Sequence, residues 1–242
     1  MSTMWERLRT VTQSRIGQDR IGDTVSSTEV LQFRAAHAMA RDAVRQPLDV
    51  QSLLEGIEGL GLGPAAVVAS RAASREEYLR RPDLGRRPAD LTTVPEGLGA
   101  DVGIVVADGL STTAVAAHAV PMLAALREVF AGRLTLAPVV VATNARVALG
   151  DHVGDHLGVS TLLVLIGERP GLSVSDSLGI YLTHRPRPGR RDAERNCLSN
   201  IHPPEGLGYA AAARTVAALV DGARLLGESG VRLKDSSHQV TG

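Results

Sequence analysis

From Asp101 to about Leu226, short apolar runs alternate with segments whose apolar residues recur at helical spacing. Four runs have the length and composition of buried strands, at residues 102–107, 138–143, 161–166 and 178–183. Helices are predicted at 112–130, 146–157 and 209–226. Strand–helix–strand repeats of this kind form right-handed parallel sheets with helices packed on their faces. The second half of the chain is therefore predicted to be a small Rossmann-like parallel-sheet domain.

The first part of the chain carries helical signals and no convincing strand. Ser26 and Glu29 form a capping-box pattern ahead of a helix that runs to about Arg45. Five of its residues recur on one face: Val30, Phe33, His37, Ala40 and Val44. Asp49 can cap a second helix, and a shorter helix is expected at 74–81. We therefore expect an α/β protein with an N-terminal helical region at 1–95 and the Rossmann-like domain at 96–242.

Composition excludes several classes of function. The 26 basic and 26 acidic side chains balance, which gives no electrostatic reason to expect nucleic acid or a membrane as a partner. Cys197 is the only cysteine, so there is no intramolecular disulfide and no CxxC metal or redox motif. Lys234 is the only lysine, and a Walker A loop is therefore absent. No nucleophile elbow, Ser-His-Asp arrangement or metal motif stands out, so no catalytic or metal-ligating residue is assigned.

Three polar turns follow predicted strands and would share one edge of the sheet. They are Asp108–Ser111, Thr143–Arg146 and Gly167–Gly171. Ligands of open parallel sheets bind beyond the carboxyl ends of the strands, so these turns could form one concave rim. Taken singly, each turn is more simply explained as turn residues and helix caps.

Other motifs are less specific. The run Gly59–Gly63 follows a helix rather than a strand, so it is predicted to be a loop and not a dinucleotide fingerprint. His152 and His156 lie four residues apart, but a surface or capping role is favoured over a metal site. Segment 184–196 contains five arginines and leads to Cys197 and the polar turn Ser199–Asn200. Such a loop could cover an anionic or amide-bearing ligand at the sheet edge.

The sequence resembles the small (light) subunit of ethanolamine ammonia-lyase. The resemblance rests on SRIGQDRIGD at 14–23, LQFRAAHAMARDAV at 31–44, RPDLGRR at 81–87, ADGLSTTAV at 107–115, RVALGD at 146–151 and the long block IGERPGLSVSDSLGIYLTHRPRPGRRDAERNCLSNI at 166–201. These segments cover most of the chain and keep the order of the family, and the block at 166–201 is the most specific of them.

The resemblance implies a cofactor, a partner and three site residues. The family's enzyme is a carbon–nitrogen lyase that uses adenosylcobalamin, with its cobalt, to convert ethanolamine to acetaldehyde and ammonia by a radical mechanism. Its large subunit holds the substrate, and the small subunit caps the cobalamin. The family's cobalamin contacts match Val147, through its backbone carbonyl, Glu168 as an acceptor, and Cys197. Asp108 and Ser111 are weaker candidates on the same edge.

Two alternatives stay open at this point. The chain could be a stand-alone nucleotide- or flavin-binding module on a Rossmann-like fold, or a degenerate subunit that acts only in assembly. The family resemblance further implies a cytoplasmic hetero-oligomer for ethanolamine degradation, either free or inside a bacterial microcompartment. The helical region at 1–95 is expected to pack on the large subunit.

Overall fold

The computed structural model describes residues 4–18 and 20–235. Its helices are α1 (Met4–Arg9), α2 (Ser27–Arg45), α3 (Val50–Gly59), α4 (Arg75–Arg80), α5 (Thr112–Phe130), α6 (Val147–Leu157) and α7 (Tyr209–Leu226), with 3-10 turns η1 (Leu84–Arg86) and η2 (Asp192–Glu194). The strands are β1 (Arg20–Ile21), β2 (Thr24–Val25), β3 (Ala66–Ala69), β4 (Val102–Ala107), β5 (Val140–Thr143), β6 (Thr161–Gly167), β7 (Leu178–His184) and β8 (Asn196–Ile201).

Six strands form one mixed sheet in the order β3-β5-β4-β6-β7-β8, whereas β1 and β2 form a separate antiparallel pair. The strands β3, β5, β4 and β6 run parallel. The α/β class is confirmed, but the prediction of a wholly parallel sheet needs correction because β7 and β8 are antiparallel to their neighbours. Residues 168–177 join β6 to β7 without a crossover helix, and a strand that follows such a short connection returns as a hairpin.

Two strands of the sheet lie outside the sequence predictions. β3 falls in the region expected to contain no strand, and it is the edge strand beside β5. β8 includes Ser199 and Asn200, which were expected to form a turn. Both are edge strands with several exposed side chains. β3 is apolar but only four residues long, and β8 is largely polar, so neither has an apolar run as long as those of the predicted strands. The sheet therefore contains strands from both sides of the predicted boundary at residue 95.

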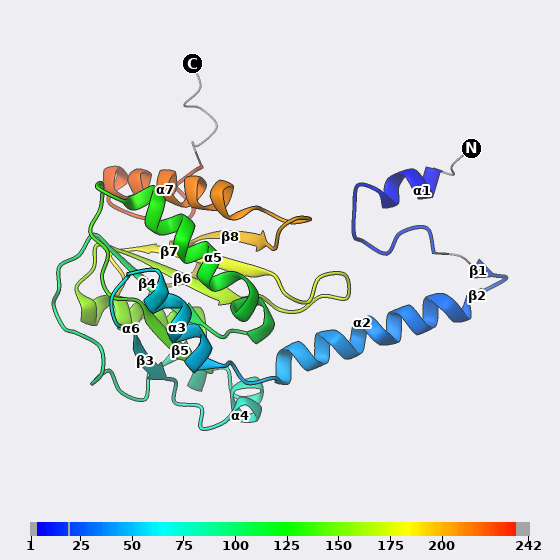
Figure 1. The fold of residues 1–242 in the computed structure, drawn as a ribbon, viewed down its shortest axis with the longest axis horizontal. Coiled ribbons are helices and arrows are strands. Elements are labelled where there is room, and N and C mark those ends of the chain that lie inside the picture. The colour runs from blue at the N-terminus through cyan, green and yellow to red at the C-terminus, as the bar shows by residue number, and fades with distance from the viewer. Residues whose placement is uncertain (1–3, 19, 236–242) are drawn as a thin grey trace, which may run out of the picture.

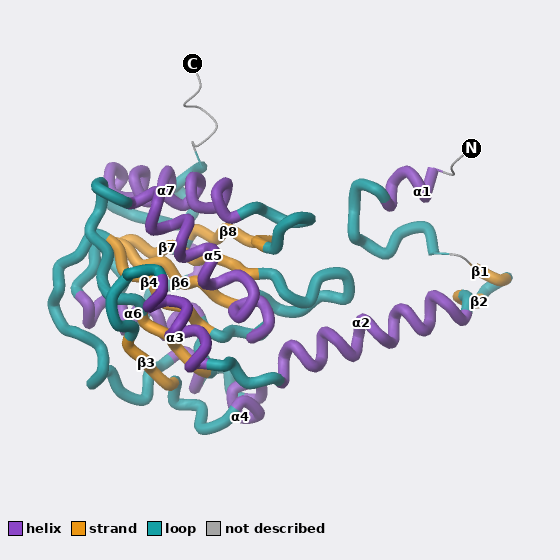
Figure 2. Tube along the Cα trace, in the orientation of Figure 1, coloured by secondary structure: helices purple, strands orange, loops and turns teal. Residues whose placement is uncertain are grey.

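Helices cover the sheet on both faces (Figures 1 and 2). One core cluster joins α3, α5 and α7 to one face of the sheet, and the other joins α6 to the opposite face. Successive side chains of a strand point to opposite faces of the sheet. In β4, Ile104 and Val106 belong to the first cluster, and Val105 and Ala107 to the second. β4 is buried along its whole length, which explains its continuous apolar sequence.

Helix α6 lies very close to the sheet because of two glycines. A Cβ atom on Gly150 would lie 2.5 Å from the Val164 side chain of β6, and one on Gly154 would lie 2.6 Å from Pro186. Both glycines are buried, on the side of α6 that faces the sheet. Close approach of backbones is a common reason for glycine inside a helix.

Helix α2 projects from the body of the molecule, with the β1–β2 pair at its far end, and α1 is drawn above α2 (Figure 1). Its cap is as predicted, since Ser26 Oγ accepts a hydrogen bond from the Glu29 N–H. Ala43 is the only buried residue of the helix, and Phe33 on the predicted apolar face is 47% exposed. The segment from α1 to α2 is called the arm below. It joins the body at its C-terminal end, where Arg75 donates to the Val44 carbonyl and Thr112 donates to that of Gln46.

Among the described residues, α5 is the one helix with the length and apolar composition of a membrane span. It lies in the core between the sheet and the helices α3 and α7, where nine of its residues are buried. This is the position of a core helix, so the composition of α5 is explained without a membrane.

Candidate functional site

The three polar turns meet at one cavity beyond the carboxyl ends of β4, β5 and β6. The cavity has a volume of about 260 Å³. Its lining residues come from all three turns, from α4 and from β7: Tyr78, Gly109, Leu110, Arg146, Val147, Ile166, Gly167, Glu168, Arg169 and Tyr181. From β4 the chain passes to β5 on one side and then returns to β6 on the other, which is the switch point where open sheets bind ligands. The predicted concave rim is confirmed.

Asp108 holds two of these turns together. Its carboxylate accepts hydrogen bonds from the backbone N–H groups of Asn144, at 2.7 Å, and Ala145, at 2.9 Å. Arg75 completes the set with an ion pair of 3.1 Å. Ser111 is likewise used internally, because its hydroxyl caps α5 and donates to the Ser175 carbonyl. The two weaker candidates of the sequence analysis therefore shape the rim from below and do not line the cavity.

Val147 is the first residue of α6 and lines the cavity. The first N–H groups of a helix have no partner within it, while the carbonyl of its first residue accepts from the next turn. No side chain caps α6, although Leu149 donates its N–H to the Arg146 carbonyl. The helix therefore directs unpaired N–H groups and the positive end of its dipole toward the site.

Glu168 follows β6, and its carboxylate is held in place by the residue before β7 and by two residues of β8. One carboxylate oxygen accepts from Ser199, and the other accepts from Ser177, at 2.5 Å, and from the Asn200 N–H, at 3.2 Å. A carboxylate offers about four acceptor positions, so this half-buried group keeps capacity for one further donor. Ser177 and Ser199 were not among the predicted site residues, because nothing in their local sequence relates them to Glu168.

Cys197 does not line the cavity but lies next to a residue that does. In the β7–β8 register it is paired with Tyr181, whose hydroxyl is its neighbour. Partial desolvation raises the pKa of the Cys197 thiol, and the Glu168 charge adds to this effect while Tyr181 opposes it. Desolvation likewise raises the pKa of Tyr181 to about 12. Both groups are therefore protonated at neutral pH and can act as hydrogen-bond donors.

Tyr78 is a site residue that sequence reasoning missed, and it lies beside Arg146, the last residue of one of the predicted polar turns. Tyr78 is fully buried, donates to the Ala145 carbonyl at 3.1 Å, and lies with its ring 4.5 Å from the Arg146 guanidinium carbon. Among the described residues, the Nε atom of Arg146 is buried without a hydrogen-bond partner. Tyr78 lies in a short helix remote in sequence from the sheet edge, so only the fold brings it to Arg146.

Two further motifs of the sequence can be placed in the structure. Gly59 ends α3, and the segment after it is a loop before β3. His156 Nε2, in the last turn of α6, lies 3.1 Å from the Val94 carbonyl and so connects the helix to the loop before β4. In the described part of the chain, no three His, Cys, Asp or Glu side chains are grouped as a metal site would require.

Comparison with known proteins gives a single family. A family model described as ethanolamine ammonia-lyase light chain matches residues 2–234. The ethanolamine ammonia-lyase small subunit of Rhodococcus erythropolis is 58% identical over 233 residues, which cover 96% of this chain and 90% of the relative. The small subunits of Ralstonia nicotianae and Azotobacter vinelandii are 44% and 45% identical, each over 96% of this chain and 88% of the relative. The chain therefore belongs to the ethanolamine ammonia-lyase light chain family.

Proposed function

We propose that this ammonia-lyase subunit binds adenosylcobalamin at the cavity beyond β4, β5 and β6, and that it caps the cofactor while a large subunit holds ethanolamine. Membership of the family supports the lyase activity and the large-subunit partner. The single observation that carries the cofactor site is the meeting of Val147 and Glu168 at one cavity. The family resemblance and the strand-end rule point to these two residues independently.

The polar groups at the cavity fit the cofactor. The corrin ring of cobalamin carries amide side chains, which both donate and accept hydrogen bonds. Glu168 has acceptor capacity left for an amide N–H, and the unpartnered Nε of Arg146 can donate to an amide carbonyl. The Val147 carbonyl has a second lone pair beside its helical hydrogen bond, so Val147 can offer both this carbonyl and, as a residue of the first turn of α6, its N–H. Cys197 and Tyr181 would lie at the side of the bound cofactor.

In this proposal the chain binds, orients and excludes water, and it performs no bond-breaking step. When bound, adenosylcobalamin supplies the radical chemistry that starts the conversion of ethanolamine to acetaldehyde and ammonia. Glu168 is fixed in advance by Ser177, Ser199 and Asn200, so it needs little ordering when it accepts a hydrogen bond. The rigid sheet edge beneath the turns, tied by Asp108, keeps the cavity open in the same way.

Reconstitution with a cognate large subunit tests the proposal. Ethanolamine-dependent acetaldehyde formation is expected only when both chains and adenosylcobalamin are present. Equal activity of the large subunit alone would contradict it. Tight binding of NAD or a flavin by this chain, with no binding of cobalamin by the complex, would favour the stand-alone nucleotide module. Assembly without any effect on cobalamin binding would favour a purely structural subunit.

We further propose that the N-terminal region packs on the large subunit, chiefly through the arm. Exposed apolar side chains gather there: Met4, Trp5, Leu8, Val11, Val25, Leu31, Phe33 and Met39. A helix of 19 residues that buries only Ala43 within its own chain gains little stability from packing, so it needs a partner. The cytoplasmic location, free or in a microcompartment, stays a prediction.

A further inference from the structure

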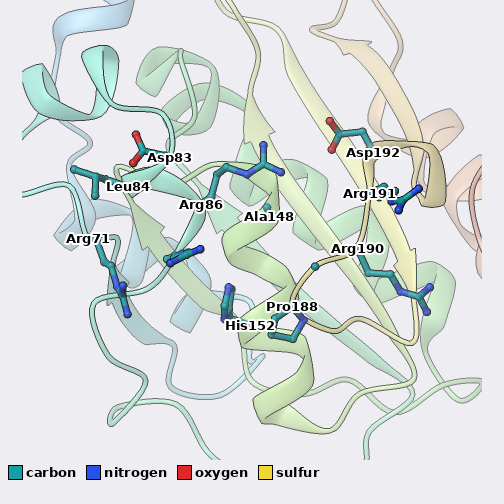
Figure 3. Close-up of a pocket in the computed structure, with 12 residues that line it drawn as sticks. Arg71, Asp83, Leu84, Arg86, Ala148, His152, Pro188, Arg190, Arg191 and Asp192 are labelled. Atoms are coloured by element: carbon teal, nitrogen blue, oxygen red, sulfur yellow. The ribbon is translucent and has the colours of Figure 1, made fainter.

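A second, larger hollow lies beside the first turn of α6 and is lined mainly by basic side chains (Figure 3). Its volume is about 780 Å³, which is within the usual range of small-molecule sites. The basic residues come from the segment after β3 (Arg71), from η1 and the residue after it (Arg86 and Arg87), from α6 (His152), and from the loop before β8 (Arg190 and Arg191). The hollow joins two segments of the sequence, 81–87 and 184–196, that are each rich in arginine. It is called the arginine hollow below.

The acidic residues of the arginine hollow do not balance this charge. Asp83 is held by Arg81, which lies outside the lining, at 2.8 Å. Asp192 is 85% exposed and lies 3.6 Å from Arg195. Arg195 itself is buried and paired with Asp151. Its two terminal guanidinium nitrogens, Nη1 and Nη2, each donate to one carboxylate oxygen of Asp151 at 2.6 Å. It is therefore a structural ion pair between α6 and the loop before β8, and it does not contribute a free cation.

Three arginines of the hollow have no acidic side chain in the described part of the chain to neutralise them, even if Asp192 is counted as the partner of Arg191. Arg190 is paired with Glu194, but among the described residues neither Arg71, Arg86 nor Arg87 forms an ion pair. Desolvation lowers the pKa of His152, and the charges of Arg87 and Arg71 lower it further, so cations lie close enough to resist another positive charge. Clustered like charges raise the energy of the empty site, and an anion would relieve it.

Helix α6 adds a second, independent feature that favours an anion. Ala148 in its first turn lines the arginine hollow, whereas the preceding residue, Val147, lines the cofactor cavity. No side chain caps this turn, so its N–H groups and helix dipole are available to a negatively charged group. The two sites therefore lie on either side of one uncapped helix end.

We propose that the arginine hollow binds a phosphate group of a ligand, with Arg71, Arg86 and Arg87 as its main cationic partners and the N-terminus of α6 behind it. Guanidinium groups bind phosphate oxygens in pairs and stay charged at every physiological pH. The phosphate group has two candidate sources. One is the phosphodiester in the nucleotide tail of a cobalamin bound in the neighbouring cavity, and for this source the inference rests on the proposed function. A free phosphorylated small molecule is the other source.

Titration of the full chain with pyrophosphate at constant ionic strength tests the site without the cofactor. The double variant Arg86→Gln/Arg87→Gln is expected to bind pyrophosphate at least about tenfold more weakly than the wild type, or about 1.4 kcal/mol. Arg214→Gln is the matched control, because this exposed arginine lies on α7 outside the hollow. Both substituted arginines are exposed, so thermal unfolding should not change. No pyrophosphate binding by the wild type, or equal binding by both variants, would overturn the proposal.

Binding of adenosylcobalamin and adenosylcobinamide to the two-chain complex then identifies the source. Adenosylcobinamide has the corrin ring but lacks the nucleotide and its phosphodiester. A loss of affinity in Arg86→Gln/Arg87→Gln for adenosylcobalamin alone assigns the phosphate to the cofactor. Unchanged affinity for both, together with weaker pyrophosphate binding, assigns it to a free phosphorylated ligand. If the wild-type complex binds neither corrinoid, the proposed function is wrong. The pyrophosphate titration still tests whether the arginine hollow binds a phosphate group.

Discussion

At the residue scale, Glu168 combines a structural role with a proposed binding role. Its carboxylate holds β8 through Ser199 and Asn200 and faces the cavity from the end of β6. Replacement by glutamine keeps the size but removes the charge that strengthens a hydrogen bond from a cofactor amide. We expect Glu168→Gln to weaken adenosylcobalamin binding to the two-chain complex by about 1.5–3 kcal/mol, measured by equilibrium titration.

Two variants separate that effect from general changes. Glu96→Gln removes one exposed carboxylate outside the site and should leave the affinity unchanged. Cys197→Ala should cost less than Glu168→Gln, because a protonated thiol is a weak hydrogen-bond partner and lies beside the cavity rather than in its lining. Unchanged cobalamin affinity in Glu168→Gln would argue against its binding role.

The site residues that could be predicted are those that follow strands. Glu168 comes directly after β6 and Val147 follows the polar turn after β5, so the strand-end rule and the family motif both find them. Tyr181 was hidden because it sits inside a buried strand and looks like a core residue. Tyr78 and Ser199 lie far from the turns in sequence, and only β3 pairing and the β7–β8 hairpin bring their segments to the site. Local pattern carries no information on such contacts.

At the element scale, the end of β6 tolerates no side chain at Gly167. A Cβ atom there would lie 1.9 Å from the Ser111 carbonyl oxygen, and the Leu110 N–H donates to the Gly167 carbonyl at 2.9 Å. Gly167→Ala must therefore push the turn after β4 away from β6. Since the clash is with backbone, we expect a loss of more than about 2 kcal/mol in the free energy of unfolding, measured with urea. Gly208→Ala, where a Cβ atom would meet open space, is the control and should change stability far less.

The start of β4 is fixed by an acidic residue whose charge matters in a defined pH range. Arg224 of α7 and the backbone and hydroxyl of Thr135 lower the pKa of Asp101 to about 2. The stabilising effect is complete above the ordinary pKa, 3.8, and is lost as the pH falls toward 2. We expect Asp101→Asn to lower the free energy of unfolding at pH 7, with the difference from the wild type shrinking between pH 4 and pH 2. A difference that stays constant down to pH 2 would show that the charge contributes nothing.

The elements themselves were predictable to different degrees. Each predicted helix is found within a few residues, because caps such as Ser111 and Asp49 and the apolar period are local signals. The antiparallel direction of β7 depends on the connection before it rather than on its own residues. The edge strands β3 and β8 are stabilised by pairing with a neighbour; the two valines of β3 favour a strand over too few residues to stand out, and the polar residues of β8 do not favour one.

At the scale of the whole molecule, the chain consists of a body with a continuous core and an arm without one. The body buries apolar residues of its own chain on both faces of the sheet. Near the C-terminal end of the arm, the Val44 carbonyl accepts a hydrogen bond from Arg75, and the carbonyl of Gln46, just after the arm, accepts one from Thr112. Sequence periodicity correctly places an apolar face on α2, but it cannot say whether that face is buried by the same chain or by another.

The arm gives the clearest prediction at this scale. Leu31 is 64% exposed and Met39 is 63% exposed, so neither contributes to the core of the body. The double substitution Leu31→Gln/Met39→Gln should therefore leave the thermal unfolding of the isolated chain unchanged. If the arm packs on the large subunit, burying these side chains there contributes about 1.5–3 kcal/mol each, and their loss should weaken complex formation by tenfold or more. Leu225→Gln is the matched control, because this leucine is 93% exposed but lies on α7 in the body. Assembly can be measured by analytical ultracentrifugation with the large subunit, and equal affinity of both variants would place the interface elsewhere on the chain.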